Sequence, residues 1–357
     1  MRTSQALREL PARLFHKVRF QKSRLVRWVE TTYLDLMRAD QFVTERRRPR
    51  IVRTRGPASA TDSRSDTAIV MQGPVRWFNE LSRQAGTEFT FETLRQYRTN
   101  YPNAPIILST WDDECTAEVR NWCRRWSIEL VAQKSPPNCG ISNMNLQMAS
   151  SAMGVRHAES LGASFTLKTR TDQRIGNDRL LEFLHSALRV FPALEGTFLQ
   201  EQRIVALSFN TFLYRLSGVS DMFTFGTTHD VATYWNGRHD TRPPTWKSVA
   251  GTPREFAAQR VCEVAFCSAF LESTGWNLQW TLADYWDALR RRFIVLDATS
   301  VDFLWPKYSR VEERWSMHRG YYHEEVSFAS WLSLQLDEHV EANESLLDLP
   351  VKQFMPE

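Results

Sequence analysis

From residue 67 onward, short apolar segments alternate with longer segments in which apolar residues recur at helical spacing. The apolar segments are bounded by polar residues, glycine or proline, as is typical of buried strands. They lie at residues 67–72, 104–110, 128–133 and 165–170. Helical patterns lie at 91–100, where Thr90 can cap the helix, around 119–126 and at 145–162. Strands that alternate with helices usually form right-handed crossovers, so the pattern predicts an α/β domain with a mainly parallel sheet.

The same alternation continues less regularly toward the C-terminus. The sequence predicts a strand at Met222–Phe225, a turn at Gly226 and a helix that begins at Thr227 or Thr228. The alternation ends with two helical patterns, at 259–272 and 280–292, and with an apolar segment at 290–297. We therefore expect the α/β domain to span residues 67–325, with a helical tail at 326–357.

Residues 1–66 have a different character. They contain 16 Lys and Arg against 7 Asp and Glu, a net charge of +9, and since the whole chain carries +4, the remainder carries −5. Apolar and aromatic residues are interleaved with these cations at roughly helical spacing, as in helices that lie on a surface. Residues 45–66 have the composition of a solvated linker. The sequence thus predicts a basic helical arm and linker ahead of the α/β domain.

Several classes of protein are excluded by what the sequence lacks. It contains no Gly-x-Gly-x-x-Gly turn and no Gly-Lys-Ser/Thr loop, which argues against dinucleotide-binding and P-loop proteins. No apolar segment reaches the length of a transmembrane helix. The five cysteines form no zinc spacing, and their odd number indicates reduced thiols and a cytoplasmic location.

Polar residues follow the predicted strands where those strands end. Ligands of parallel α/β sheets bind beyond the carboxyl ends of the strands, so these residues are expected to line one crevice. They are Gln72 and Gly73, residues 109–112, Lys134, and the charged segment "LKTRTDQR" at 167–174.

The charged segment is the most distinctive of these features. Lys168, Arg170, Asp172 and Arg174 alternate, so they share one face if the strand continues through them. Arginine binds phosphate oxygens through paired hydrogen bonds. Asp172 either holds one Mg²⁺ or Mn²⁺ together with substrate phosphates, or orients Arg170 and Arg174. The alternative without a ligand is a surface charge network at a strand end, and for Lys168 a structural ion pair.

The segment from Met71 to about Trp235 resembles the WavE lipopolysaccharide-synthesis family. The matching stretches are Gln72-Gly73, "IILSTW" at 106–111, "GISNMNLQ" at 140–147, "LKTRTDQR" at 167–174 and "GVSDMFTFG" at 218–226. The resemblance implies a GT-A-like nucleotide-sugar transferase fold and a role in lipopolysaccharide or capsule synthesis. Transferases of that fold commonly hold a metal with an Asp-x-Asp motif, and here Arg170 replaces the first carboxylate.

The resemblance also implies roles for single residues. Gln72 and Gly73 would lie near the nucleotide, and Asp112 would accept a hydrogen bond from its ribose or base. Asn143, Asn145 and Gln147 stand at the start of the long helix at 145–162, where free backbone N–H groups attract phosphate. For Asn143, an ordinary helix cap is an equally good interpretation.

The resemblance places the catalytic base on the acceptor side, after the charged strand. In an inverting transferase such a carboxylate deprotonates the acceptor hydroxyl. The candidates are Asp221, Asp230 and Glu263, with Asp221 first because the surrounding match is strongest. Structural alternatives are a helix cap for Asp221 or Asp230 and a helix-face charge for Glu263. Family members favour proline before the residue that matches Glu263, whereas this chain has Cys262.

The sequence therefore predicts a glycosyltransferase that moves a sugar from a nucleotide-diphosphate donor to a saccharide or lipid-linked acceptor. The alternatives are a non-catalytic scaffold that binds nucleotide sugar or glycan, and a sugar-phosphate transferase. Because such acceptors grow on lipid carriers, we expect residues 1–55 to bind an anionic membrane surface on its cytoplasmic side. An acidic body without a nucleic-acid-binding fold argues against nucleic acid as the partner.

Overall fold

A computed structural model describes residues 65–75, 89–194, 196, 199–305, 321–336 and 342–351. All of them belong to one unit of the chain, Arg55–Glu357. The predicted basic arm and linker, residues 1–66, lie outside the described residues except for Ser65 and Asp66.

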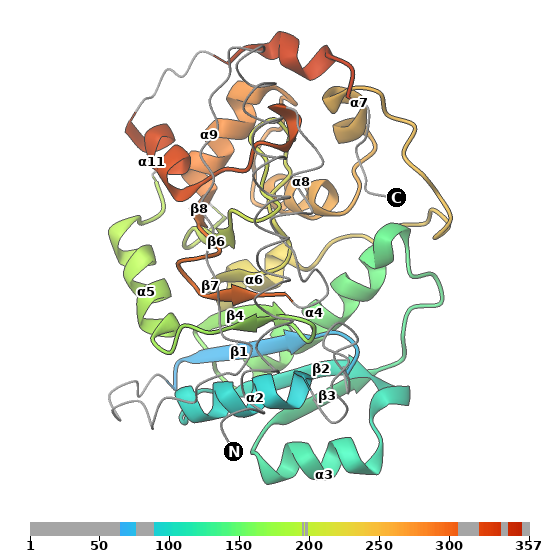
Figure 1. The fold of residues 1–357 in the computed structure, drawn as a ribbon, viewed down its shortest axis with the longest axis vertical. Helices are drawn as coiled ribbons and strands as arrows, with labels where there is room; N and C mark the ends of the chain where they lie inside the picture. Colours follow the sequence, from blue (N-terminus) through green and yellow to red (C-terminus); the bar gives the residue numbers. More distant parts are fainter. Residues whose placement is uncertain are drawn as a thin grey trace, which may run out of the picture. The chain divides into compact units, whose positions relative to one another are not determined.

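A seven-stranded sheet, in the order β3-β2-β1-β4-β7-β6-β8, forms the centre of this unit (Figure 1). Its strands are β1 (Thr67–Gln72), β2 (Ile106–Trp111), β3 (Glu129–Gln133), β4 (Phe165–Arg170), β6 (Ile204–Leu207), β7 (Thr224–Thr227) and β8 (Phe293–Leu296). All neighbouring strands are parallel except β7, which is antiparallel to both β4 and β6. The predicted α/β fold with a mainly parallel sheet is therefore confirmed.

Helices cover both faces of the sheet, which explains why β1 is a continuous apolar run. Ile69 and Met71 pack in the same core cluster as helix α2 (Phe89–Asn100). The alternate residues Ala68 and Val70 pack instead with Ala158 of helix α4 (Met144–Ser160). Since successive side chains of a strand point to opposite faces, α2 and α4 lie on opposite sides of β1.

Helix α4 approaches the sheet closely through a glycine. A Cβ atom added at Gly154 would collide with Cγ1 of Val70 and would lie 3.0 Å from Cβ of Ser109. Ser109 also donates from Oγ to the backbone carbonyl of Ser150 at 2.6 Å. The absence of a side chain at residue 154 thus fixes the height of α4, and with it the position of the α4 N-terminus above the sheet.

The remaining described elements surround this core. The other α-helices are α3 (Ala117–Arg125), α5 (Leu180–Val190), α6 (Thr228–Tyr234), α7 (Pro253–Ala258), α8 (Glu263–Ser273), α9 (Leu282–Arg292) and α11 (Phe328–Leu336). The 3-10 turns are η1 (Asp112–Glu114), η2 (Ile141–Asn143), η3 (Tyr321–His323) and η4 (Glu344–Asp348). Strands β5 (Arg174–Ile175) and β9 (Phe303–Leu304) form a separate antiparallel pair.

The structure differs from the sequence prediction in three places. Gly226 lies inside strand β7, paired with Thr166, and not in a turn. Thr90 lies within α2 and does not cap it, and its hydroxyl donates to the carbonyl of Thr171. Strand β4 ends at Arg170, so the charged segment does not continue as one strand.

The described part of the C-terminal tail packs into the main core. Trp331 of α11 is fully buried, and its indole N–H donates to the carbonyl of Leu289 in α9.

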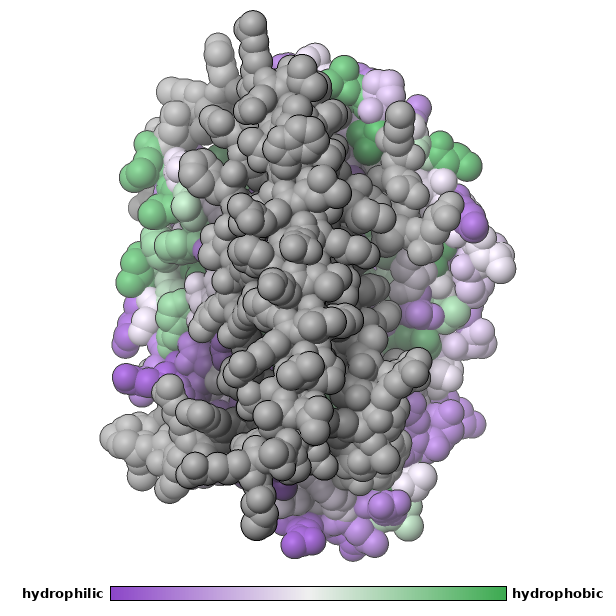
Figure 2. All heavy atoms as spheres, viewed as in Figure 1, coloured by the Kyte–Doolittle hydropathy of each residue, from purple (hydrophilic) through white to green (hydrophobic). Residues whose placement is uncertain are grey.

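On the face drawn in Figure 2, hydrophilic residues gather at the lower end, over α3. Within the described residues, no helix is both long and apolar enough to cross a membrane.

Candidate functional site

The carboxyl edge of the sheet brings together several sequence-distant polar residues. Strands β1, β2, β4 and β6 all end at this edge, because they run in the same direction. Strand β7 runs the other way, so the residues that precede it, including Asp221, reach the same edge. The connection between β6 and β7, residues 208–223, is almost entirely buried although it contains no regular helix or strand. Binding and catalytic residues often lie on connections of this kind that a rigid sheet holds in place.

Lys168 lies inside the sheet beneath this edge and is fully buried. Its ammonium group donates to the backbone carbonyl of Asp221 at 2.7 Å and lies 4.0 Å from the centre of the Trp235 ring. Burial lowers the pKa of Lys168 well below its ordinary value, and the charge of nearby Asp221 partly opposes that effect. Lys168 thus has a structural contact, but this bond is to a backbone carbonyl and is not the ion pair of the structural alternative; the side chain anchors the segment that carries Asp221.

Asp221 is held from two sides. Besides the bond that Lys168 makes to its carbonyl, its carboxylate accepts a hydrogen bond of 2.6 Å from the amide of Gln147 in α4. Asp221 is 6% exposed. Because α4 and the β6–β7 connection meet at this contact, the predicted residues Gln147 and Asp221 do lie together at the carboxyl edge.

Glu263 is the first residue of α8 and joins the same group. Its carboxylate accepts a hydrogen bond from the side-chain amide of Asn210, in the β6–β7 connection. Burial, with the charge of Asp221 as the second cause, raises the pKa of Glu263 to about 7. Two carboxylates within electrostatic reach cannot ionise independently, because the negative charge of each disfavours the ionisation of the other. Glu263 is thus a carboxyl group that exchanges its proton near neutral pH.

The backbone on both sides of this contact adopts a conformation that is unfavourable for L-amino acids. Cys262, directly before Glu263, has φ of 44°, and Asn210 has φ of 69°. Such residues cost of order 1–3 kcal/mol each and cluster at functional sites. Arg215, in the β6–β7 connection, lies within electrostatic reach of Glu263. We call Gln147, Lys168, Asn210, Arg215, Asp221 and Glu263 the carboxyl-edge cluster.

Arg170 and Asp172 form a second group within electrostatic reach of Lys168. The Nε and Nη2 atoms of Arg170 each donate to one carboxylate oxygen of Asp172 at 3.0 Å. The indole N–H of Trp305 donates to the same carboxylate at 3.1 Å, and the Trp305 ring lies under the Arg170 guanidinium. Asp172 therefore orients Arg170, whereas its second predicted role also included Arg174, which makes its contacts elsewhere.

The same contacts decide whether Asp172 suits a divalent metal. Both of its oxygens already accept hydrogen bonds from Arg170, and one of them also accepts from Trp305. A divalent ion would have to displace the paired guanidinium and sit beside its positive charge. In the described part of the chain, no group of three or more His, Cys, Asp and Glu residues is placed to hold a metal ion. The surroundings of Asp172 thus do not fit the predicted Mg²⁺ or Mn²⁺ site.

Arg174 does not share a face with Arg170 and Asp172, because β4 ends before it. Its guanidinium turns toward α2, where it donates to the hydroxyl of Thr93 at 2.8 Å and lies 4.5 Å from the Phe89 ring. It is 5% exposed. Arg174 therefore fastens α2 to the sheet, and the expectation that it joins Arg170 around a diphosphate does not match this geometry.

Asp230 is also separated from the carboxyl edge. It follows β7, which is antiparallel, and so stands at the opposite edge of the sheet. Its carboxylate accepts from the backbone N–H groups of Glu201 and Gln202 and from the hydroxyl of Thr227. Burial raises its pKa, although these bonds oppose the shift. Asp230 is a fully buried structural residue, but the cap of α6 is Thr227 and not Asp230, and its place at the opposite edge does not suit a catalytic base.

The residues after β1 and β2 have mixed surroundings. The amide oxygen of Gln72 accepts a hydrogen bond of 2.6 Å from Ser150 of α4. Gly73 has φ of 121°, and a Cβ there would lie 2.8 Å from the hydroxyl of Thr171. The close approach that Gly73 permits is therefore to the end of β4. Asp112 is exposed in η1, beyond the end of β2.

At the N-terminus of α4, Asn143 and Asn145 differ. Asn143 is exposed, has φ of 62° and forms no side-chain cap, so the helix-cap interpretation is wrong. Asn145 is 1% exposed and exchanges hydrogen bonds with the backbone of Asp240, donating to its carbonyl at 2.8 Å and accepting from its N–H at 2.7 Å. Asn145 is thus part of the framework that holds the N-terminus of α4.

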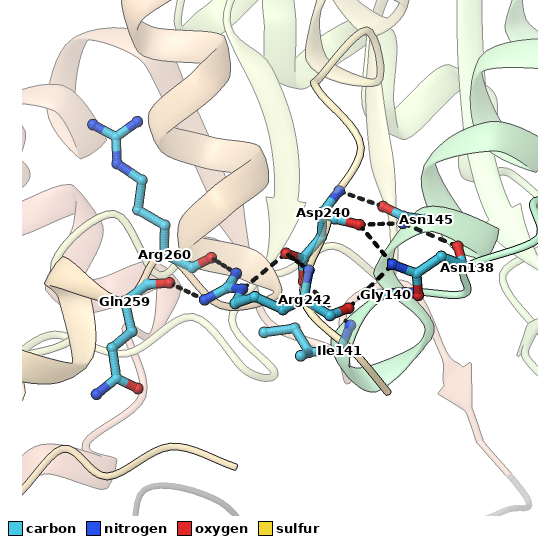
Figure 3. A network of polar contacts seen from close by, with 8 residues as sticks. All are labelled: Asn138, Gly140, Ile141, Asn145, Asp240, Arg242, Gln259 and Arg260. Atoms are coloured by element: carbon cyan, nitrogen blue, oxygen red, sulfur yellow. Dashed lines mark hydrogen bonds and ion pairs between the residues drawn. The ribbon is translucent and has the colours of Figure 1, made fainter. Parts of the chain in front are cut away.

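Figure 3 shows how this framework reaches α8. The carboxylate of Asp240 accepts from the guanidinium of Arg242 at 2.8 Å and from the backbone N–H of Ile141 at 3.2 Å. Arg242 in turn donates to the carbonyls of Gln259 and Arg260, shortly before α8 begins. The network therefore fixes the starts of α4 and α8, which carry Gln147 and Glu263, relative to each other.

Sequence reasoning did not single out three residues of the site. Asn210 and Arg215 lie in the β6–β7 connection, where no strand end or motif marks them. Trp305 lies in a segment without a regular pattern. Asn210 and Trp305 are revealed only by their hydrogen bonds to Glu263 and Asp172, and Arg215 only by its place within electrostatic reach of Glu263, so the sequence offered no usable signal.

A comparison with protein families places the chain among proteins of polysaccharide synthesis. The model described as WavE lipopolysaccharide synthesis matches residues 67–271, more than half of the 357 residues. The match covers the sheet up to β7, helix α4 and most of α8, and so includes both groups of site residues. A search of curated proteins found no match.

Solved structures offer only distant likenesses. A cytidylyltransferase from Leptospira borgpetersenii is 10% identical over 47% of this chain and 63% of its own length, with a TM-score of 0.30. Core-mannan synthase A from Aspergillus fumigatus is 12% identical over 70% and 77%, with a TM-score of 0.32. A mannosyltransferase from Pyrobaculum calidifontis is 12% identical over 76% and 84%, with a TM-score of 0.28. The chain spans less than two thirds of the cytidylyltransferase, and at these TM-scores none of the three says what the chain does.

Proposed function

Because the chain belongs to the WavE lipopolysaccharide synthesis family, we propose that it is a glycosyltransferase acting at the carboxyl edge of its sheet. It moves a sugar from a nucleotide-diphosphate donor to a hydroxyl group of a saccharide or lipid-linked acceptor. The observation that carries this proposal is the position of the Glu263 carboxyl group, which Asn210 holds at the carboxyl edge within electrostatic reach of Asp221, and whose pKa burial and Asp221 raise to about 7. A general base is most effective when its pKa lies near the working pH.

Each group has a part in the proposed reaction. Glu263 accepts the proton of the acceptor hydroxyl while the hydroxyl oxygen forms a bond to the anomeric carbon of the donor sugar. The bond from that carbon to the diphosphate oxygen breaks, and the nucleoside diphosphate leaves with the electron pair. Arg170, oriented by Asp172 and Trp305, stabilises the negative charge that develops on the leaving phosphate. Asn210 and Gln147 hold Glu263 and Asp221 in position.

This assignment refines the sequence-based ranking of the bases. Asp221 ranked first by its motif, but its carboxylate is 2.6 Å from the Gln147 amide, and its backbone carbonyl is bound by Lys168. Asp221 therefore serves best as the fixed charge that keeps the pKa of Glu263 high. Glu263 stands at a helix start, half-buried, where an acceptor hydroxyl can reach it.

The nucleotide released tests this proposal against its two rivals. The full-length protein is incubated with UDP-, GDP- and dTDP-sugars and an acceptor extract of lipid-linked saccharides. Sugar transfer releases the nucleoside diphosphate, whereas sugar-phosphate transfer releases the monophosphate. A thermal shift with a nucleotide sugar, without release of either nucleotide, would identify a binding scaffold instead.

The location of the reaction follows from the acceptor. Lipid-linked acceptors lie in a membrane, and residues 1–55, which are outside the described part of the chain, carry most of its basic surplus. The proposal is therefore a peripheral enzyme on the cytoplasmic side of the membrane, attached through anionic lipid headgroups.

A further inference from the structure

Four arginines of the described chain are almost completely buried, and one of them differs from the rest. Arg174, Arg203 and Arg292 each donate a hydrogen bond from a terminal nitrogen to a protein oxygen. Arg215, in the β6–β7 connection, donates only from Nε, to the hydroxyl of Tyr322 at 3.1 Å. Among the described residues, neither terminal nitrogen of Arg215 has a hydrogen-bond or ion-pair partner.

These terminal nitrogens are nevertheless reachable. Arg215 is 6% exposed. Some side-chain nitrogen and oxygen atoms of the described residues are shielded from solvent and have no hydrogen-bond partner. They include the Nε atoms of Arg203 and Arg292 but no atom of Arg215. The small exposed part of Arg215 therefore includes its terminal nitrogens, and a ligand can approach the end of the guanidinium.

The guanidinium is held rigidly for such an approach. It lies 4.1 Å from the centre of the Phe212 ring and 5.4 Å from the centres of the Phe256 and Tyr322 rings. A Cβ at Gly218 would lie 2.6 Å from Cγ and Cδ of Arg215, so the aliphatic stem lies directly against the backbone there. A fixed guanidinium loses little conformational entropy on binding, which favours paired hydrogen bonds to a planar anion.

The charge of Arg215 is only partly balanced. Burial alone would lower its pKa, but Tyr322 and Glu263 together raise the pKa above its ordinary value, so the side chain stays charged. Glu263 lies within electrostatic reach but forms no ion pair with Arg215 among the described residues. A buried cation without a bound counter-charge is unfavourable unless a ligand supplies one.

We infer that Arg215 binds an anionic group, a carboxylate or a phosphate, on the saccharide that the enzyme accepts. The inference rests on the proposed function for the identity of that molecule, because Glu263, the proposed base, shares this part of the cluster. The acceptor hydroxyl at Glu263 and the anionic group at Arg215 would then belong to one bound saccharide. The acceptor specificity of the enzyme would depend on Arg215, whereas donor binding would depend on Arg170.

The side-chain ¹⁵N signals of arginine test this inference in the full-length protein. Signals of Arg215 are assigned by their loss in Arg215→Lys. The protein is titrated with inorganic phosphate, with methyl glucuronide and with the neutral methyl glucoside. We expect saturable shifts of the Arg215 terminal nitrogens with one or both anions and none with the glucoside. The response to phosphate or to glucuronide identifies which anionic class the site takes.

Arg292 is the matched control, because it is equally buried but its terminal nitrogens already donate to Gln200 and to the carbonyl of Thr274. Its signals should not move. The inference is overturned if neither anion shifts Arg215, or if Arg292 shifts in parallel with it. Nucleotide release is measured in the wild-type protein with the acceptor extract. A protein that binds anions at Arg215 but releases no nucleotide would refute the proposed transferase and leave the anion site standing.

Discussion

At the scale of single residues, the account depends on carboxyl groups whose surroundings differ. Asp172 is fully engaged by Arg170 and Trp305, Asp221 is fixed by Gln147, and Asp230 is a structural residue at the opposite edge. Glu263 alone among these four combines a raised pKa near neutrality with a position at the carboxyl edge. The surroundings, and not the residue type, separate these roles.

Glu263→Gln should stabilise the folded protein at neutral and alkaline pH. The pKa of Glu263 is about 7 in the folded state and near its ordinary value of 4.5 when unfolded, so the folded state binds more protons between these values. The stability of the wild type therefore falls as pH rises from about 4.5 to 7, and glutamine removes that dependence. Urea unfolding of both proteins at pH 5 and pH 8 measures it. If the two proteins differed in free energy of unfolding by the same amount at both pH values, the raised pKa of Glu263 would be contradicted.

Trp305→Phe tests the orientation of the Arg170–Asp172 pair. Phenylalanine keeps an aromatic ring beneath Arg170 but removes the indole N–H that donates to Asp172. We expect a loss of about 1 kcal/mol in the free energy of unfolding, the typical value of one hydrogen bond. The thermal shift caused by a nucleotide sugar should decrease. An unchanged ligand shift would mean that the pair does not face the donor.

The sequence located individual site residues unevenly, for physical reasons. Gln147 could be placed at a helix start, and Asp221 and Glu263 were candidates through the family resemblance. The direction of Arg174 depends on where β4 ends, and no local pattern fixes that residue. Asn210 and Arg215 belong to an irregular buried connection, whose path is decided by tertiary packing alone.

At the scale of elements, the site depends on how α4 and α8 are held. The predicted strands β1 to β4 and helix α4 are confirmed. They could be predicted because their hydrophobic patterns are regular and turn residues bound them. Strand β7 was misplaced by two residues, since Gly226 reads as a turn although Thr166 pairs with it in the sheet. Helix α5 and strand β6 were not predicted. The sequence thus revealed the half of the sheet with regular crossovers better than the half with the antiparallel strand.

Arg242→Met should weaken the connection between the starts of α4 and α8. It removes the ion pair with Asp240, whose carboxylate is almost buried, and the bonds to the carbonyls of Gln259 and Arg260. We expect a loss of about 2–3 kcal/mol in the free energy of unfolding, because Asp240 is left without its partner.

Arg254→Met is the matched control for that variant. Its ion pair with Asp348 is exposed, with side chains 43% and 60% accessible, so solvent screens the attraction and its loss should cost little. Urea unfolding of the two variants should therefore differ clearly. Equal losses would show that the Asp240 network does not hold the two helix starts together.

At the scale of the whole molecule, the division between a basic arm and an acidic remainder suggests a division of tasks. Residues 1–66 carry +9, and the rest of the chain, which contains the described sheet and site, carries −5. Charge attracts the arm to anionic lipid at about 1 kcal/mol per basic residue near the surface. The acidic remainder would not bind such a surface by charge.

Sedimentation with liposomes tests this division. The full-length protein should sediment with vesicles that contain anionic lipid, and a chain that starts at Asp66 should stay in solution. Binding of the full-length protein should also weaken at high salt, because salt screens the attraction. Equal sedimentation of the two chains would assign the membrane contact to residues after 66.

The initial rate of nucleoside diphosphate release, with acceptor present, tests the central claim most directly. Glu263→Gln is compared with Glu272→Gln, a change of the same type in the same helix, at an exposed residue paired with Arg260. Loss of a general base costs about 100-fold or more in rate, so Glu263→Gln should be nearly inactive, and Glu272→Gln should match the wild type. The wild-type rate should also fall as pH drops below about 7. A Glu263→Gln variant that releases nucleoside diphosphate at the wild-type rate would contradict the account.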